Sequence, residues 1–165
     1  MILVMSGGIG GINLIKLCDE LVESTDINYR IFAMTGRNES LKNEIDKRYN
    51  NLAHIQAVPF TRDINLYMNS ANVLLTKPGG LSSTEAAVAN IPIIHVNAIP
   101  GCETKNAAFF ENHGMSYNAK NTSEAVRYAL ALTENENACS QMIYNQKQNI
   151  NPNAAYDIAK RVARI

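Results

Sequence analysis

Five short apolar runs alternate with longer segments in which apolar positions recur every three or four residues. The runs are apolar at consecutive positions or rich in β-branched residues, a pattern typical of strands buried on both faces of a sheet. A sixth short strand is predicted at Met115–Tyr117. The five runs are Ile2–Met5, Tyr29–Met34, Ala53–Val58, Val73–Thr76 and Pro92–Val96.

The segments between these runs have the helical period. Gly114 is a suitable residue to end the fifth helix, and Asn121 is the predicted N-cap of the sixth, with Glu124 at position N3. Strict alternation of strand and helix predicts an α/β fold: a doubly wound, mostly parallel six-stranded sheet followed by C-terminal helices. The predicted helices are Gly11–Glu23, Glu39–Tyr49, Arg62–Asn69, Ser83–Ala89, Glu103–Asn112, one after Asn121, Glu134–Gln148 and Asn153–Ile165.

The composition is that of one globular domain. The 165 residues are 46% hydrophobic, and fifteen basic residues balance fifteen acidic ones, which argues against a broad nucleic-acid footprint. Three widely spaced cysteines without zinc-site spacing favour a reducing, intracellular compartment. No signal-peptide pattern is present, and no apolar stretch approaches the roughly 18 residues of a membrane span. We therefore expect a cytoplasmic protein that is at most peripheral to a membrane.

Two glycine-containing loops follow the first two predicted strands, at the sheet edge where open α/β sheets bind ligands. In Ser6–Gly11, SGGIGG, the glycines let the backbone approach a phosphate at a helix N-terminus, although a plain tight turn explains them as well. The loop Thr35–Glu39, TGRNE, lacks the acidic residue that a dinucleotide-binding dehydrogenase places there. Arg37 is either a ligand or a solvated surface residue.

A third loop and helix start, Thr76–Glu85, combines a cation, glycines and hydroxyls. Lys77 can offer a charge to a phosphate, Gly79 and Gly80 keep the backbone open, and Ser82–Thr84 lie over a helix N-terminus, where an anion is favoured.

Glu85 has two interpretations. An acid beside an anion site can accept both hydroxyls of a ribose. Alternatively, Ser82–Glu85 forms a capping box, with Ser82 as the N-cap and Glu85 at N3. The local sequence leaves both open.

The stretch KPGGLSSTEAAVANIPIIHVNAIPGCETKNAAFFENHG, residues 77–114, carries a resemblance to a known family. K-P-G-G, S-x-E-A and P-G-x-E-x-x-N in this order resemble the C-terminal, nucleotide-sugar-binding domain of family-28-type GT-B glycosyltransferases. Within them, the monogalactosyl- and diglucosyl-diacylglycerol synthases are the most similar. The resemblance covers essentially the whole chain and implies the Rossmann-like half of a GT-B fold.

The resemblance implies roles for residues around a UDP-sugar. Gly7–Gly10 would lie against the diphosphate, Phe60 and Thr61 would meet the uracil, and Lys77–Gly80 would flank the diphosphate and sugar. Glu85 would hold the ribose hydroxyls. With the loop residues considered above, the predicted site comprises Gly7, Gly8, Ile9, Gly10, Gly36, Arg37, Phe60, Thr61, Lys77, Pro78, Gly79, Gly80, Ser83, Thr84, Glu85, Pro100, Gly101, Glu103 and Asn106.

The hexose end of the site departs from the family pattern. The resemblance implies that Glu103 and Asn106 contact hydroxyls of the donor hexose. Where the lipid glycosyltransferases usually have P-G-Q-E, this chain has Pro100–Glu103 with Cys102 in place of the glutamine. Cysteine is a weak hydrogen-bonding group, so the hexose stays open, and we interpret Cys102 as a packed small apolar side chain.

The resemblance further implies that an acceptor domain is missing. In such enzymes the N-terminal domain supplies the acceptor site and the catalytic base, usually a histidine. The three histidines here, His54, His95 and His113, are interpreted as structural. We therefore expect residues 1–165 to be a single donor-binding domain without catalytic residues, either a fragment or a natural separate subunit. A start on the first strand favours the fragment.

The resemblance implies the donor domain of an inverting hexosyltransferase. Its partners would be a UDP-hexose and, through the missing domain, a lipid acceptor of the diacylglycerol type at the cytoplasmic membrane face. No cofactor and no metal are expected, because helix dipoles and Lys77 would replace Mg²⁺. The alternatives are a peptidoglycan-type N-acetylglucosaminyltransferase, a nucleotide-sugar 2-epimerase-like protein and a noncatalytic UDP-binding module.

Overall fold

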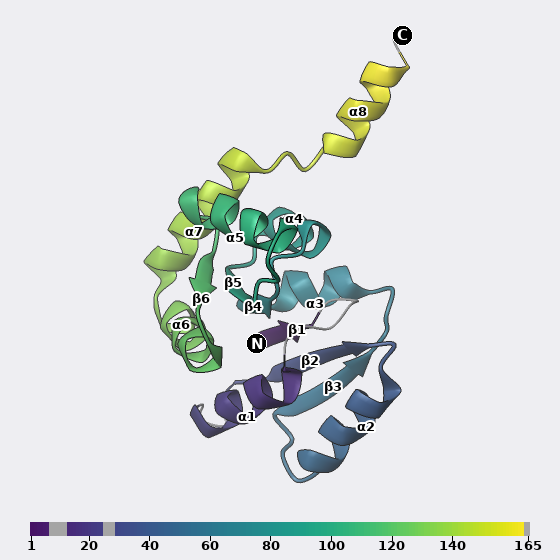
Figure 1. The fold of residues 1–165 in the computed structure, drawn as a ribbon, viewed down its shortest axis with the longest axis vertical. Coiled ribbons are helices and arrows are strands. Elements are labelled where there is room, and N and C mark those ends of the chain that lie inside the picture. Colours follow the sequence, from purple (N-terminus) through teal and green to yellow (C-terminus); the bar gives the residue numbers. More distant parts are fainter. Residues whose placement is uncertain (7–12, 25–28, 164–165) are drawn as a thin grey trace.

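The computed structural model describes residues 1–6, 13–24 and 29–163 as a six-stranded sheet with helices on both faces (Figure 1). The strands are β1 (Ile2–Met5), β2 (Ile31–Gly36), β3 (Ile55–Pro59), β4 (Val73–Thr76), β5 (Ile93–Val96) and β6 (Tyr117–Ala119). The helices are α1 (Leu14–Ser24), α2 (Glu39–Arg48), α3 (Ile64–Ser70), α4 (Gly80–Val88), α5 (Cys102–Asn112), α6 (Thr122–Glu134), α7 (Glu136–Asn149) and α8 (Ala154–Val162).

The sheet has the order β3-β2-β1-β4-β5-β6, and every strand pairing in it is parallel. Leu3 of β1 lies opposite Phe32 of β2 on one side and Leu74 of β4 on the other. Successive strands are therefore added on one side of β1 as far as β3 and on the other side from β4 onwards, so the strand order reverses between β1 and β4. This confirms the predicted doubly wound α/β sheet and locates its topological switch point.

Alternate residues of the central strands enter two separate cores, as the pleat of a strand requires. Ile2 and Val4 of β1 join the core under α1, α2 and α6, whereas Leu3 joins the core under α3, α4 and α5. Because both faces are covered, the strands are apolar at consecutive positions. This is the physical origin of the uninterrupted apolar runs in the sequence.

The last strand begins two residues later than predicted. Gly114 has φ +64°, and its N–H donates to Glu111 O at 2.9 Å while the N–H of Met115 donates to Phe110 O at 2.8 Å. These two bonds are the Schellman arrangement that closes α5. Met115 therefore completes the helix end, and β6 starts at Tyr117.

Helix α4 begins three residues earlier than predicted, and this overturns the capping-box interpretation. Its N-cap is Gly79, and the N–H of Ser83 donates to Gly79 O at 3.0 Å. Ser82 thus occupies N3 and Glu85 lies a turn further along. The hydroxyls of Ser83 and Thr84 have other partners, so the capping box at Ser82–Glu85 is wrong.

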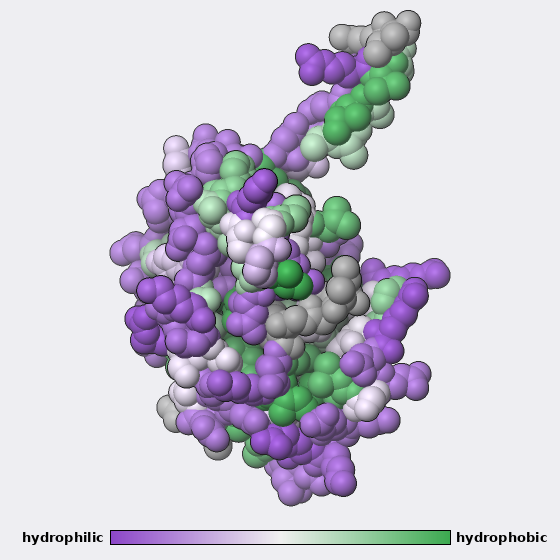
Figure 2. Space-filling model, in the orientation of Figure 1, coloured by the Kyte–Doolittle hydropathy of each residue, from purple (hydrophilic) through white to green (hydrophobic). Residues whose placement is uncertain are grey.

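Helix α8 extends away from the rest of the domain (Figure 1). None of its nine residues is buried, and Tyr156, Ile158 and Val162 are exposed. In the space-filling view the helix has one hydrophobic side along its length (Figure 2). No helix in the described part of the chain is both long enough and apolar enough to cross a bilayer.

Candidate functional site at the carboxyl edge of the sheet

The parallel strands bring the predicted ligand loops to one edge of the sheet. The loops after β2, β3, β4 and β5 all leave from the carboxyl ends of their strands, next to the switch point between β1 and β4. The predicted phosphate loop, Gly7, Gly8, Ile9 and Gly10, lies outside the described residues.

The loops after β2 and β3 are tied together by their backbones. Gly36 ends β2 with φ +58°, a conformation that favours glycine, and its carbonyl accepts the N–H of Phe60 at 2.7 Å. This contact brings the guanidinium carbon of Arg37 to 5.0 Å from the centroid of the Phe60 ring. Arg37 and Phe60 are both exposed, Phe60 by 57%, so the pair forms an accessible platform of aromatic ring and cation.

A cavity of about 480 Å³ opens beside this platform. It brings together five predicted site residues, Gly36, Arg37, Phe60, Thr61 and Glu85. The rest of its lining is Met5, Met34, Pro59, Ile64 and Ser82.

Ser82 is a lining residue that the predicted site did not include. It precedes Glu85 by three positions on α4, so both side chains share one helix face once the helix starts at Gly80.

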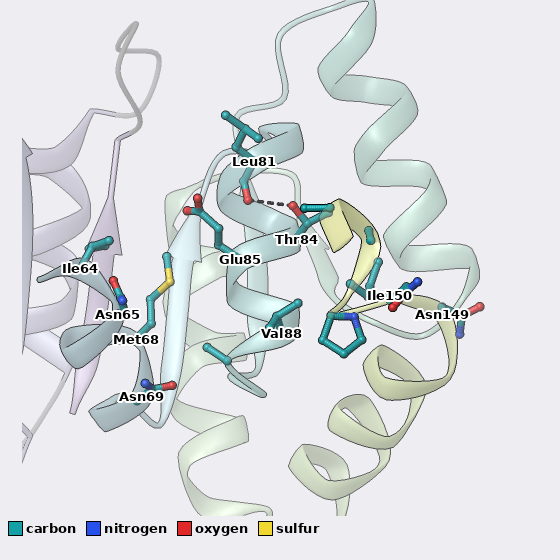
Figure 3. Close-up of a pocket in the computed structure, with 15 residues that line it drawn as sticks. Ile64, Asn65, Met68, Asn69, Leu81, Thr84, Glu85, Val88, Asn149 and Ile150 are labelled. Carbon is teal, nitrogen blue, oxygen red and sulfur yellow. Dashed lines mark hydrogen bonds between the residues drawn. The ribbon is translucent and has the colours of Figure 1, made fainter. Parts of the chain in front are cut away.

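Glu85 reaches the cavity as an exposed carboxyl group. Figure 3 shows its side chain on the side of α4 that faces α3, whereas Thr84 points to the other side, towards Asn149 and Ile150. Glu85 also lines a larger groove of about 840 Å³ between α3, α4 and residues 149–155. Among the described residues the Glu85 side chain has no hydrogen bond or ion pair, so its carboxylate oxygens are available to a ligand.

The hydroxyls of the two residues before Glu85 have partners within the protein. Ser83 is fully buried, and its hydroxyl lies 2.9 Å from Nε2 of His95, so its side chain faces the core rather than the cavity. The Thr84 hydroxyl donates to Gly80 O at 2.8 Å and to Leu81 O at 3.0 Å (Figure 3). Helix periodicity explains both, because the earlier start of α4 turns Ser83 towards β5 and Thr84 away from the cavity.

Lys77 and Glu103, predicted to contact different parts of the donor, form an ion pair. Lys77 Nζ lies 2.9 Å from Glu103 Oε1, and the two side chains are only 9% and 16% exposed. The other carboxylate oxygen accepts the N–H of Ile99 at 3.0 Å. Burial raises the pKa of Glu103, but the Ile99 hydrogen bond and the Lys77 ammonium outweigh it and hold the pKa below its usual range. Glu103 is therefore a fixed, ionised carboxylate.

A second contact joins the same two loops. The side-chain amide of Asn106 donates to Pro78 O at 3.0 Å, and its nitrogen would lie 3.8 Å from a Cβ placed on Gly80. Gly101 has φ +110°, which places the exposed turn of Pro100 and Gly101 at the start of α5. A Cβ on Gly79 would meet no described atom within 4 Å, so the K-P-G-G turn leaves open space beside it.

The contacts of His95 agree with its interpretation as a structural residue. Its two ring nitrogens lie 2.9 Å from the Ser83 hydroxyl and 3.1 Å from the Ser116 hydroxyl, and all three residues are buried. Burial lowers the pKa of His95 to about 4, and the Asn118 side chain, as a hydrogen-bond acceptor that favours the charged ring, opposes this more weakly. The ring is therefore neutral at physiological pH and links α4 to β5. His113 Nδ1 lies 2.8 Å from Phe109 O at the end of α5.

Cys102 is exposed, so its interpretation as a packed apolar side chain is wrong. It is the first residue of α5, directly after the positive-φ turn at Gly101, and this position faces solvent.

The described residues contain no cluster of three or more His, Cys, Asp or Glu side chains that could hold a metal ion. That the site works without a metal stays a prediction.

Fold and loop placement together define a Rossmann-like α/β domain whose candidate site lies at a topological switch point. Residues 1–162 match the glycosyltransferase family 28 C-terminal domain, and the chain belongs to this family. It is 32% identical over 143 residues to the processive diacylglycerol beta-glucosyltransferase of Staphylococcus carnosus. The match covers 85% of this chain and 36% of that protein, so the chain spans about a third of its relative's length.

Solved structures share the fold. MurG of Acinetobacter baumannii superposes with a TM-score of 0.79 at 21% identity, over 99% of this chain and 49% of that one. Anabaena Alr3699/HepE in complex with UDP-glucose has a TM-score of 0.72 at 14% identity, over 99% of this chain and 49% of that one. The sheet order and the flanking helices are thus those of one half of a GT-B glycosyltransferase.

Proposed function

We propose that this domain binds a UDP-hexose, and that the protein to which it belongs transfers the hexose to a lipid acceptor of the diacylglycerol type. The observation that carries the proposal is the 480 Å³ cavity, in which Arg37, Phe60 and Glu85 meet at the switch point. Its residue types suit a nucleoside. The Phe60 ring and the Arg37 cation can stack against a base, and the free Glu85 carboxylate can accept two ribose hydroxyls.

The diphosphate would lie at the start of α4. This helix begins at Gly79–Gly80 without a side-chain cap, so the N–H groups of its first turn remain for an anion. The open space beside Gly79 lets a phosphate approach the backbone. These dipoles would stabilise the charge that develops on the leaving UDP while the loops orient the hexose carbon.

Names of similar proteins support the substrate classes. The Staphylococcus carnosus relative is named for glucosyl transfer to diacylglycerol, and the Anabaena structure contains UDP-glucose. The position of the lipid acceptor at a membrane, through a further domain, is part of the proposal.

We further propose that residues 1–165 do not transfer sugar on their own. An acceptor hydroxyl needs a base within about 2.6–3.2 Å. In the described part of the site, Glu103 is engaged by Lys77 and Ile99, and His95 is buried between two serines. Glu85 is assigned to the ribose. A catalytic base would therefore come from the N-terminal domain.

Calorimetry tests the nucleotide assignment. The chain should bind UDP and UDP-glucose more tightly than ADP or NAD, and UDP-N-acetylglucosamine serves as the competitor that represents the peptidoglycan-type alternative. ADP binding equal to or tighter than UDP binding would contradict the proposal.

An assay with UDP-glucose, diacylglycerol vesicles and EDTA tests the rest. The chain alone should form no glycolipid, and transfer should appear, with EDTA present, once an N-terminal domain is added. Glycolipid formation by the purified chain alone would show that the base lies within residues 1–165.

A further inference from the structure

The Lys77 ammonium is the cation that the resemblance places near the diphosphate, yet the structure directs it elsewhere. Its side chain is 9% exposed, and Nζ lies 2.9 Å from Oε1 of Glu103. Lys77 follows β4 directly, and Glu103 lies in the first turn of α5, after β5. Since β4 and β5 are neighbours in the sheet, the two side chains meet across adjacent loops.

We propose that Lys77 is a positioning residue for the binding of the donor hexose. Lys77 holds the Glu103 carboxylate in place and does not bind the diphosphate. This inference rests on the proposed function, because it assigns the hexose end of the same site.

Both oxygens of Glu103 are fixed, one by Lys77 and the other by the N–H of Ile99. A carboxylate offers about four lone-pair directions, so two remain after these bonds. Two such acceptors at a fixed orientation suit the hydroxyl donors of a hexose. Without Lys77, the carboxylate would keep only the Ile99 bond and would be free to rotate.

Lys77 is poorly placed to serve a phosphate instead. A buried ammonium that left Glu103 for a phosphate would leave a partly buried carboxylate unpaired, which is unfavourable. The ion pair is also neutral as a unit, so it adds little field at the diphosphate. The uncapped first turn of α4 already supplies donors for that group.

Asn106, the second residue that the resemblance assigns to the hexose, is held by the same loop. Asn106 donates to Pro78 O at 3.0 Å, so the residues on both sides of the Lys77–Pro78 peptide anchor α5 side chains. The K-P-G-G loop thus acts as a support beneath the two residues that the resemblance assigns to the hexose.

The test compares the binding of UMP, UDP and UDP-glucose to the full 165-residue chain by calorimetry. Lys77→Met removes the charge at similar length, and Lys105→Met is the matched control, since Lys105 is exposed on the same helix as Glu103. We expect Lys77→Met to weaken UDP-glucose about tenfold or more, the usual effect of losing a charge-assisted contact, and to change UDP and UMP less than about twofold. Glu103→Gln should have the same selective effect, and the double variant should be no worse than the single ones.

Three results would decide otherwise. Equal weakening of UDP and UDP-glucose with UMP unaffected would make Lys77 a diphosphate ligand. Unchanged binding of all three would also overturn the inference. Failure of the unaltered chain to bind UDP would reject the proposed function, and it is distinct from the first two because it needs no variant.

Lys77→Arg covers the case in which Lys77→Met does not fold. It keeps the charge but changes the geometry at Glu103, so a positioning role predicts selective weakening of UDP-glucose. A phosphate contact predicts that UDP-glucose and UDP change together. Thermal melts confirm that each variant is folded before binding is compared.

Discussion

The two halves of the candidate site differ in where their polar side chains find partners. In the closed half, residues 77–80 and 99–106, Lys77 pairs with Glu103 and Asn106 donates to Pro78 O. In the open half, residues 36–37, 59–61 and the first two turns of α4, Arg37 lies over the Phe60 ring and Glu85 faces the cavity. Among the described residues the Glu85 carboxylate has no hydrogen bond or ion pair.

This difference separates groups that hold the site in shape from groups that are available to contact a ligand. A buried polar group must be paired within the protein, because leaving it unpaired costs free energy, so the closed half is formed in advance. Exposed, unpaired groups in the open half cost the free protein little. Changes in the closed half should therefore lower stability, whereas changes in the open half should lower nucleotide affinity alone.

The largest expected effect is on stability, in the closed half. Glu103→Ala leaves the Lys77 ammonium buried without its counter-ion, which should lower the free energy of unfolding by about 3 kcal/mol. The control is Glu20→Ala, whose partner Lys16 lies 3.8 Å away on the surface and whose loss should cost under about 1 kcal/mol. Urea denaturation measures both. Equal losses for the two variants would show that the ion pair does not hold the closed half together.

The second effect is a pH dependence set by His95, which lies under the closed half. Burial lowers its pKa from 6.5 to about 4. Between these two pH values His95 is therefore protonated in the unfolded chain and neutral in the folded chain. Stability should fall as the pH falls from 6.5 to 4, by about 3 kcal/mol from this group, and should not depend on it above 6.5.

His95→Gln should remove that part of the slope in denaturation curves collected from pH 4 to 7.5. The contributions of Asp19 and Glu103, whose pKa values are lowered in the folded state, remain in the variant and cancel in the difference. A slope that survives His95→Gln would place the titrating group elsewhere.

Glu85 tests the open half. Glu85→Gln should weaken UDP binding by about 1–3 kcal/mol, the range for charge-assisted hydrogen bonds. The melting temperature of the free protein should stay the same, because the described part of the chain gives the Glu85 carboxylate no partner and α4 does not use it as a cap. A lower melting temperature with unchanged UDP affinity would assign Glu85 to the fold.

The smallest effect is expected at Arg37. Arg37→Gln removes a cation that can stack against the base, which should weaken UDP by about 0.5–1 kcal/mol, the range for exposed cation–π contacts. Stability should be unaffected. Arg62→Gln, one residue beyond the cavity lining, is the control in the same calorimetric titration. A larger loss of UDP affinity for Arg62→Gln than for Arg37→Gln would show that the base does not bind beside Phe60.

The sheet could be predicted from the sequence because each buried strand is a separate apolar run with its own flanking loop. The pairings across the site could not. Lys77 meets Glu103, and Arg37 meets Phe60, only because β4 lies beside β5 and β2 beside β3. Local patterns contain no information on such neighbours, so Lys77 and Glu103 could only be given separate roles from the resemblance.

The start of α4 shows a second limit. Glycine pairs are typical of loops, so the helix was expected to begin after Gly80 rather than at it. With the first turn moved back to Gly80, Ser82 is helical and lies on the same face as Glu85, which is why it lines the cavity without having been predicted there.

The strand order also affects how the chain folds during synthesis. Strand β1 lies at the centre of the sheet between β2 and β4, yet β4 is translated much later. With roughly 70 residues between them and ~5–20 residues added per second, one edge of β1 waits several seconds on the ribosome without its partner. Ile2, Leu3 and Val4 are all buried in the finished sheet, so that edge is apolar on both faces while it waits. An unpaired apolar strand edge is a template for association with other chains.

Conditions that reduce such association during synthesis, namely low growth temperature and ample chaperone, should therefore raise the yield of folded protein.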